Sequence, residues 1–135
     1  MNKSKARGTE TERKTVRYLQ TWWPTAERRI LAGAFDKGDV INVPLFCLEV
    51  KGDRSNAIPK WKQETLTEQV NAGEPYCALV VRIDHKAVDQ WDLWMPIGQL
   101  GMPELGEDSW VRMPLATGVR AMLLLIERHG HSSPS

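Results

Sequence analysis

Three residues of the chain, Asp39, Glu49 and Lys51, have the types and the spacing for metal-dependent chemistry. They stand at the ends of two short apolar runs, residues 39–41 and 46–51, which are predicted to be neighbouring strands. Burying a charge beside hydrophobic strands costs free energy unless the charge has a partner. Two carboxylates that converge in such a place therefore indicate a divalent cation, which binds oxygen ligands.

The strand predicted over residues 46–51 determines which side chains can meet. The turn before it, at residues 42–44, holds a proline, which cannot donate a hydrogen bond inside a central strand. Alternation along the strand places Glu49 and Lys51 on one face and three apolar side chains on the other. A same-face ion pair between Glu49 and Lys51, worth about 0.2–1 kcal/mol, is the simpler interpretation. It does not explain why Asp39 should arrive at the same place.

The spacing of an aspartate at 39, nine further residues and Glu-Val-Lys at 49–51 resembles the core motif of the PD-(D/E)XK nuclease superfamily. The surrounding sequence is similar to the small Holliday-junction resolvase-like nucleases, including those carried by bacteriophages. The segments that carry this similarity are Arg7-Gly8 with Glu12, Arg28-Arg29, and the Asp-Lys-Gly-Asp run at 36–39. The resemblance covers residues 3 to 95. These bounds are approximate, because element boundaries predicted from sequence carry an error of a few residues.

The resemblance implies a Mg²⁺-dependent DNA endonuclease of recombination and repair, with Mn²⁺ as a substitute ion. Mg²⁺ lowers the pKa of its bound water and offsets charge on the phosphate. Lys51 would orient or activate the attacking water, and Gln63 on a second helix would lie near the scissile phosphate. The implied metal ligands are Asp39, Glu49, Glu12 and the carbonyl of Val50.

Glu12 has a second interpretation. A first helix is predicted from about Thr9 to residue 22 or 23, ending before Pro24. Thr9 and Glu12 fit a capping box, in which the glutamate reaches back to the backbone. Against this, helical spacing places Glu12 on the core-facing stripe that continues through Val16, Leu19 and Trp23.

Three other residues also have two interpretations. Asp36 is either a further acidic ligand or a turn residue before glycine. Gln63 shares a predicted inward face with Pro59, Leu66 and Val70, and is either a site residue or a packing glutamine. Trp61 stacks on a base or, as we favour, anchors the helix on the sheet.

Positive charge is concentrated in the first half of the chain. Residues 1–62 hold thirteen Lys and Arg against seven Asp and Glu, and residues 63–135 hold five against ten. This asymmetry indicates a basic surface for a polyanion, although two ordinary solvated faces would give the same count. One arginine of the strand predicted over 25–31 is expected to reach a phosphate. The predicted DNA contacts are Lys3, Lys5, Arg7, Arg13, Lys14, Arg17, Arg28 and Arg29.

A chain of 135 residues is expected to form one domain. We predict a basic, disordered arm at residues 1–7 and a solvated polar tail at 129–135. No apolar run is long enough for a membrane span and no signal-peptide core is present, so a cytoplasmic protein is expected, in the host cytoplasm if phage-encoded. Cys47 and Cys77 are interpreted as buried, reduced thiols.

The remaining pattern predicts an α/β domain with a restriction-endonuclease-like core, a mixed central sheet flanked by helices in the order α-β-β-β-α-β, with β and α additions. A turn or loop is expected at 32–35, and loops with at most one short helix are expected at 96–109. The other predicted elements are a helix at 59–73, strands at 76–83, 91–95 and 110–115, and a helix at 118–128.

The substrate expected from the resemblance is branched DNA, such as a Holliday junction, and the expected assembly is a homodimer whose two-fold axis provides two cutting sites. A nuclease of other specificity, restriction-like or exonucleolytic, is the alternative among enzymes. A non-catalytic DNA-binding module of the same fold is the alternative from another class.

Overall fold

Strands β3 (Phe46–Lys51) and β4 (Tyr76–Val81) form the buried centre of the sheet. They pair in parallel, with Cys47 opposite Cys77 and Glu49 opposite Leu79. Two parallel neighbours need a long crossover, which helix α2 (Ile58–Ala72) supplies. Ten of the twelve residues in these strands are buried, as expected for strands covered on both faces.

The computed structural model describes residues 3–30, 36–106 and 108–131, and the loop predicted at 32–35 lies outside these residues. The described strands form a six-stranded mixed sheet in the order β1-β2-β3-β4-β5-β6, in which the β3–β4 pair is parallel and the other pairs are antiparallel. The strands beside the central pair are β1 (Glu27–Arg28), β2 (Val40–Ile41), β5 (Asp92–Pro96) and β6 (Trp110–Pro114). The predicted α/β class with a mixed sheet is therefore confirmed.

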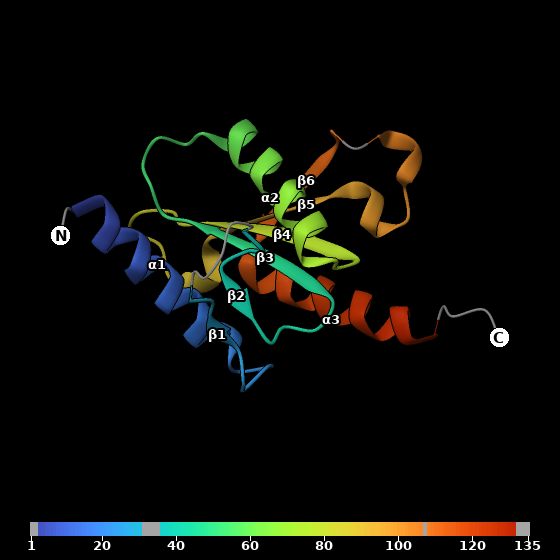
Figure 1. The fold of residues 1–135 in the computed structure, drawn as a ribbon, viewed down its shortest axis with the longest axis horizontal. Coiled ribbons are helices and arrows are strands. Elements are labelled where there is room, and N and C mark those ends of the chain that lie inside the picture. The colour runs from blue at the N-terminus through green and yellow to red at the C-terminus, as the bar shows by residue number, and fades with distance from the viewer. Residues whose placement is uncertain (1–2, 31–35, 107, 132–135) are drawn as a thin grey trace.

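The helices lie on both faces of the sheet (Figure 1). Helices α1 (Lys3–Leu19) and α3 (Leu115–His131) pack on one face, where the larger apolar cluster joins them to alternate residues of the strands. Helix α2 covers the other face, where the buried Trp61 packs on Leu79 and Val81. Trp61 is thus an apolar anchor, as favoured above.

Helix α1 begins six residues earlier than predicted. Lys3 to Arg7 are helical, so the expectation of a disordered arm is wrong for these residues; Met1 and Asn2 lie outside the described residues. Arg7 explains the early start, because its guanidinium binds the Gly52 carbonyl and lies 2.5 Å from Asp84 Oδ1. These contacts with the end of β3 and the segment after β4 hold the first turn of α1 on the protein.

The inward face of α2 also differs from the prediction. Its buried residues are Trp61, Thr65 and Glu68, whereas Val70 exposes 79% of its surface and Gln63 is exposed. The prediction followed the apolar residues, but a threonine and a glutamate occupy the core-facing positions. The bounds of α2 agree closely with the prediction, and Gly73 ends the helix in the left-handed conformation.

Other bounds differ by smaller amounts. Helix α3 extends through His129, whose Nδ1 lies 3.2 Å from the Tyr76 hydroxyl, so residues 129–131 are helical and not a tail. The first strand is shorter than predicted, because among the described residues of 25–30 only Glu27 and Arg28 pair with β2; residue 31 lies outside the described residues. The described residues between 96 and 109 hold two short 3₁₀ helices, η2 (Ile97–Leu100) and η3 (Pro103–Leu105), so the expectation of at most one short helix is wrong. A further 3₁₀ helix, η1 (Val88–Gln90), precedes β5.

Cys47 and Cys77 are buried and unbonded to each other, as expected. Within the described ranges, none of the helices has the length and apolar character needed to cross a membrane.

Candidate metal centre

Asp39 is held in place by three hydrogen bonds, two to residues of β3 and one to Arg29. Its N–H donates to the Leu48 carbonyl (2.7 Å), its carbonyl accepts from the Arg29 N–H (2.8 Å), and its Oδ2 accepts from the Val50 N–H (2.7 Å). The preceding Gly38 has φ of 96°, and a Cβ there would lie 2.8 Å from the Leu48 carbonyl oxygen. Glycine at 38 therefore allows the chain to turn Asp39 onto the edge of β3.

Asp39 and Glu49 bring two carboxyl groups into direct contact. Burial, followed by the hydrogen bond and the charge of Glu49, raises the pKa of Asp39 to about 9, although the Val50 N–H opposes this rise. Glu49 exposes only 2% of its surface, and burial with the nearby Glu68 raises its pKa to about 8. Two carboxyl groups in contact, that of Glu49 buried and that of Asp39 half-buried, must share a proton or a cation.

Lys51 lies on the same face of β3 as Glu49, as alternation predicted. Its Nζ is 3.9 Å from Glu49 Oε2 and 2.9 Å from Glu64 Oε2 on α2. Desolvation alone would lower the pKa of Lys51, but the hydrogen bond to Glu64 and the charge of Glu49 outweigh it and raise the pKa. Lys51 is therefore an ammonium ion at neutral pH.

Glu12, on α1, lies close enough to Asp39 to feel its charge. Its Oε1 accepts a hydrogen bond from Arg28 Nε (3.1 Å). Burial and the charge of Asp39 raise the pKa of Glu12 in spite of Arg28. Thr9 lies inside α1 and not at its N-terminus, so the capping-box interpretation is wrong. What remains is a carboxylate within electrostatic reach of Asp39.

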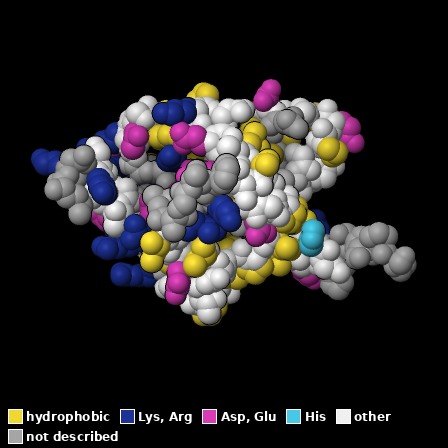
Figure 2. All heavy atoms as spheres, viewed as in Figure 1, with side chains coloured by type: hydrophobic (Ala, Val, Ile, Leu, Met, Phe, Trp, Pro, Cys, Tyr) yellow, Lys and Arg dark blue, Asp and Glu magenta, His cyan; other side chains and the backbone are white. Residues whose placement is uncertain are grey.

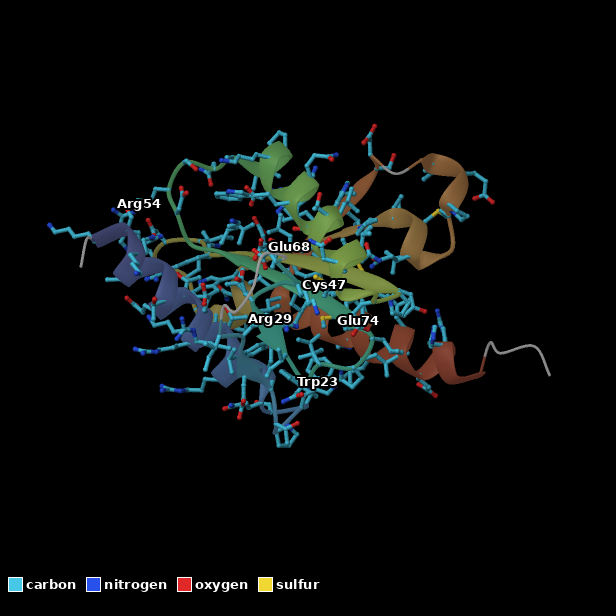
Figure 3. The ribbon with its side chains drawn as sticks, viewed as in Figure 1. Trp23, Arg29, Cys47, Arg54, Glu68 and Glu74 are labelled. Atoms are coloured by element: carbon cyan, nitrogen blue, oxygen red, sulfur yellow. The ribbon has the colours of Figure 1, made fainter. Side chains whose placement is uncertain are left out.

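Asp36 and Glu68 join the cluster from the other side. An oxygen of Asp36, one of Glu49 and one of Glu68 all lie within 4.8 Å of one another. Asp36 is also a turn residue, since its Oδ1 accepts a hydrogen bond from the Gly38 N–H (2.9 Å). Its position is therefore compatible with both interpretations, a turn residue and an acidic ligand. Figure 3 shows Glu68 between α2 and β3.

Glu68 was missed from the sequence because its role depends on which face of α2 is buried. Trp61 was the available signal: a helix anchored by Trp61 directs residues four and seven positions later, Thr65 and Glu68, to the same face. Burial raises the pKa of Glu68 to about 7, with the hydrogen bond to Glu49 opposing and the contact with Asp36 adding to the rise.

Gln63 does not point inward as predicted. It is exposed and lines a cavity of about 590 Å³ that opens beside the acidic residues. Lys51, Glu49 and Glu68 line the same cavity. Gln63 is thus near the cluster, at its solvent side, and not packed in the core.

Val50 places its N–H, and therefore its carbonyl, on the strand edge that faces Asp39, because both groups of one strand residue point to the same side. The donor set around this edge is composed of carboxylate and carbonyl oxygens, which suit Mg²⁺, Mn²⁺ and Ca²⁺ and not the softer metals. A bound cation would also offset the burial and the neighbouring acidic groups that now raise the pKa of Asp39 and Glu49.

The basic residues predicted to contact DNA divide into two groups. Arg7 and Arg28 are engaged inside the protein, with Asp84 and with Glu12 respectively. Arg29 donates to the Gly38 carbonyl and so supports the turn before Asp39. The exposed members of the set, which lie on α1, are Lys3, Lys5, Arg13, Lys14 and Arg17. Figure 2 shows Lys and Arg side chains gathered at the left, over α1.

The chain was compared with protein-family models, with curated proteins and with solved structures, and none of the three comparisons found a match.

Proposed function

We propose that the protein is a Mg²⁺-dependent endonuclease of the PD-(D/E)XK type that cuts branched DNA, built on a restriction-endonuclease-like core and working in the cytoplasm. The observation that carries the proposal is the contact between the carboxyl groups of Asp39 and Glu49, with the ammonium group of Lys51 3.9 Å from Glu49. A structural ion pair would need only one carboxylate beside the lysine. A second carboxyl group, half-buried and in contact with the first, is explained by a cation.

The residues of the centre have separate tasks in this proposal. Asp39, Glu49 and Glu12 hold the ion, with the Val50 carbonyl on the same edge. When bound, Mg²⁺ lowers the pKa of a water molecule and stabilises charge on the phosphoryl oxygens. Hydrolysis then forms a bond between the water oxygen and phosphorus and breaks the bond to the leaving sugar oxygen, which takes up a proton.

The protonation state of Lys51 limits its role. Because Glu64 and Glu49 keep it charged, Lys51 is suited to neutralise the phosphate and orient the water, and not to remove a proton from that water. Glu12, with its raised pKa and its contact to Arg28, contributes a ligand that is ionised when a cation is present.

The exposed basic residues of α1 supply the phosphate contacts in the proposal. They lie on the same helix as Glu12, one of the proposed ligands. A homodimer would present two such centres about a two-fold axis, which suits symmetric cutting of a four-way junction.

The test is cleavage of a four-way junction, a fork and a linear duplex of related sequence, each with Mg²⁺ and with EDTA. We expect Mg²⁺-dependent cutting of the junction in preference to the duplex. Asp39→Asn is the control: it should abolish cutting while junction binding in a gel shift is retained or tightened, because a negative charge near the phosphates is gone. Cutting in EDTA would contradict the proposal. Junction binding without cutting by the wild-type protein would identify a DNA-binding module instead.

A further inference from the structure

The side chain of Glu68 is the most unusual buried group that the proposed mechanism leaves unused. It exposes 5% of its surface, and its Oε2 is buried without a hydrogen-bond partner among the described residues. A buried carboxylate oxygen that lacks a partner is costly, and such groups are rare in folded proteins. The surroundings of Glu68 therefore require an explanation.

Those surroundings are acidic. The oxygens of Asp36, Glu49 and Glu68 that lie within 4.8 Å of one another come from three elements: the segment before β2, strand β3 and helix α2. Ligand oxygens bound to one Mg²⁺, Mn²⁺ or Ca²⁺ at about 2.0–2.6 Å lie at most about 4–5 Å apart. The three oxygens are therefore close enough to bind one ion together.

The polypeptide holds this arrangement from both sides. Asn71, in the last turn of α2, donates through Nδ2 to the Asp36 carbonyl (2.9 Å) and so ties the Asp36 segment to the helix that carries Glu68. Asp36 is exposed and the cavity beside the three acids is open, so water molecules can complete the coordination of an ion. Lys51 is directed to Glu64 and Glu49, and no described basic residue pairs with Glu68.

We infer that Asp36, Glu49 and Glu68 form a second divalent-cation site, which shares Glu49 with the site at Asp39. The inference goes beyond the proposed function, because it adds ligands from α2 and from the turn before β2. It does not depend on DNA cleavage, since binding of the ion is a property of the free protein.

The experiment is a titration of the metal-free, full-length protein with Mn²⁺. Binding is measured by isothermal titration calorimetry and, separately, by the electron paramagnetic resonance signal of the Mn²⁺ that stays free. We expect two ions per wild-type chain. Glu68→Gln, which keeps the size of the side chain, should bind one ion, and Asp39→Asn should retain the ion at Asp36, Glu49 and Glu68. The matched control is Glu64→Gln, one turn earlier on α2 and in the same cavity, which should still bind two.

Glu68→Gln is expected to fold, because it replaces a carboxylate whose buried Oε2 lacks a partner with a neutral side chain of the same size, and circular dichroism checks this. Asp36→Asn, at an exposed position, is the second variant and should lose the same ion. One ion per wild-type chain, or two ions in both Glu68→Gln and Asp36→Asn, would overturn the inference. A protein that binds two ions but cuts no DNA would contradict only the proposed function, and a nuclease that binds one ion would contradict only this inference.

Discussion

The Nζ of Lys51 lies 2.9 Å from Oε2 of Glu64, closer than the 3.9 Å that separates it from Glu49 in its own Glu-x-Lys tripeptide. The lysine is therefore positioned by α2 as much as by β3. Glu64 is part of the reason that the pKa of Lys51 is raised. A helix residue outside the sequence motif thus influences the charge of a residue inside it.

The first prediction concerns this contact. Glu64→Gln removes a charge and a hydrogen bond that raise the pKa of Lys51, so that pKa should fall. If cleavage needs charged Lys51, the alkaline limb of the pH–rate profile should move to lower pH. Stability should change by less than about 1 kcal/mol, because the pair is partly exposed. The control is Glu10→Gln, an exposed acid on α1 that pairs with Lys14 and should leave the limb in place. If the alkaline limb of the pH–rate profile stays in place in Glu64→Gln, the ionisation of Lys51 does not control the cleavage rate.

The second prediction tests Glu12 as a ligand. Glu12→Gln should lower the cleavage rate sharply, because a hard cation prefers a charged carboxylate, and excess Mg²⁺ or Mn²⁺ should rescue part of the loss. The thermal midpoint of the metal-free protein should change little, because an amide oxygen can still accept the hydrogen bond from Arg28.

The matched control for Glu12 is Thr9→Ala. Since Thr9 lies inside α1, its replacement removes no cap and should not reduce stability by the ~1 kcal/mol typical of a lost cap. If the Glu12→Gln protein cleaves at the wild-type rate in limiting Mg²⁺, Glu12 is only the partner of Arg28.

The third prediction is a dependence of stability on pH. The pKa values of Asp39, Glu49 and Glu68 are raised to about 9, 8 and 7 in the folded protein. Between their ordinary values and these raised values, the folded state holds protons that the unfolded chain has released. The metal-free protein should therefore lose stability as pH rises from about 4 towards 9, and the contribution is fully present only below the ordinary values.

Urea denaturation in EDTA at several pH values measures this slope. Mg²⁺ should restore stability mostly at the alkaline end, because the ion requires ionised carboxylates. The double variant Asp39→Asn, Glu68→Gln should flatten the slope. Stability that increases over the same range in EDTA would mean that the carboxyl groups are not in contact.

The fourth prediction separates phosphate contacts from structural arginines. If Arg13 and Arg17 meet phosphates, each alanine variant should weaken junction binding and reduce the slope of log K against log salt concentration by about 0.9. Arg7→Ala should instead lower the thermal midpoint, since Arg7 is bonded to Asp84 and the Gly52 carbonyl. A salt slope near zero for the wild-type protein would exclude the basic face of α1 as a DNA surface.

The fifth prediction compares two glycines. Gly38→Ala should destabilise the protein by more than about 1 kcal/mol, because φ is 96° and the new Cβ would lie 2.8 Å from the Leu48 carbonyl oxygen. Gly8→Ala should stabilise it by about 0.5–1 kcal/mol, because Gly8 is helical and a Cβ there meets nothing within 4 Å. Equal effects of the two changes on the urea midpoint would contradict the turn geometry at Asp39.

The sequence alone determined the elements that local pattern controls. The strand at 46–51, with Glu49 and Lys51 on one face, follows from alternation, and α2 follows from a proline near its start and a glycine after its end. These signals are local because backbone geometry, and not distant packing, sets the period of the side chains. The α/β class with a mixed sheet could be predicted for the same reason.

Only the tertiary structure decided which residues complete the acidic centre. The inward position of Glu68 and the outward position of Gln63 depend on how Trp61 anchors α2 on β4, and this contact is not visible in the sequence of the helix. The early start of α1, which removed the capping role of Thr9, depends on the contact of Arg7 with Asp84. Both outcomes come from long-range contacts, whose free energy outweighs the local preferences that a sequence pattern reports.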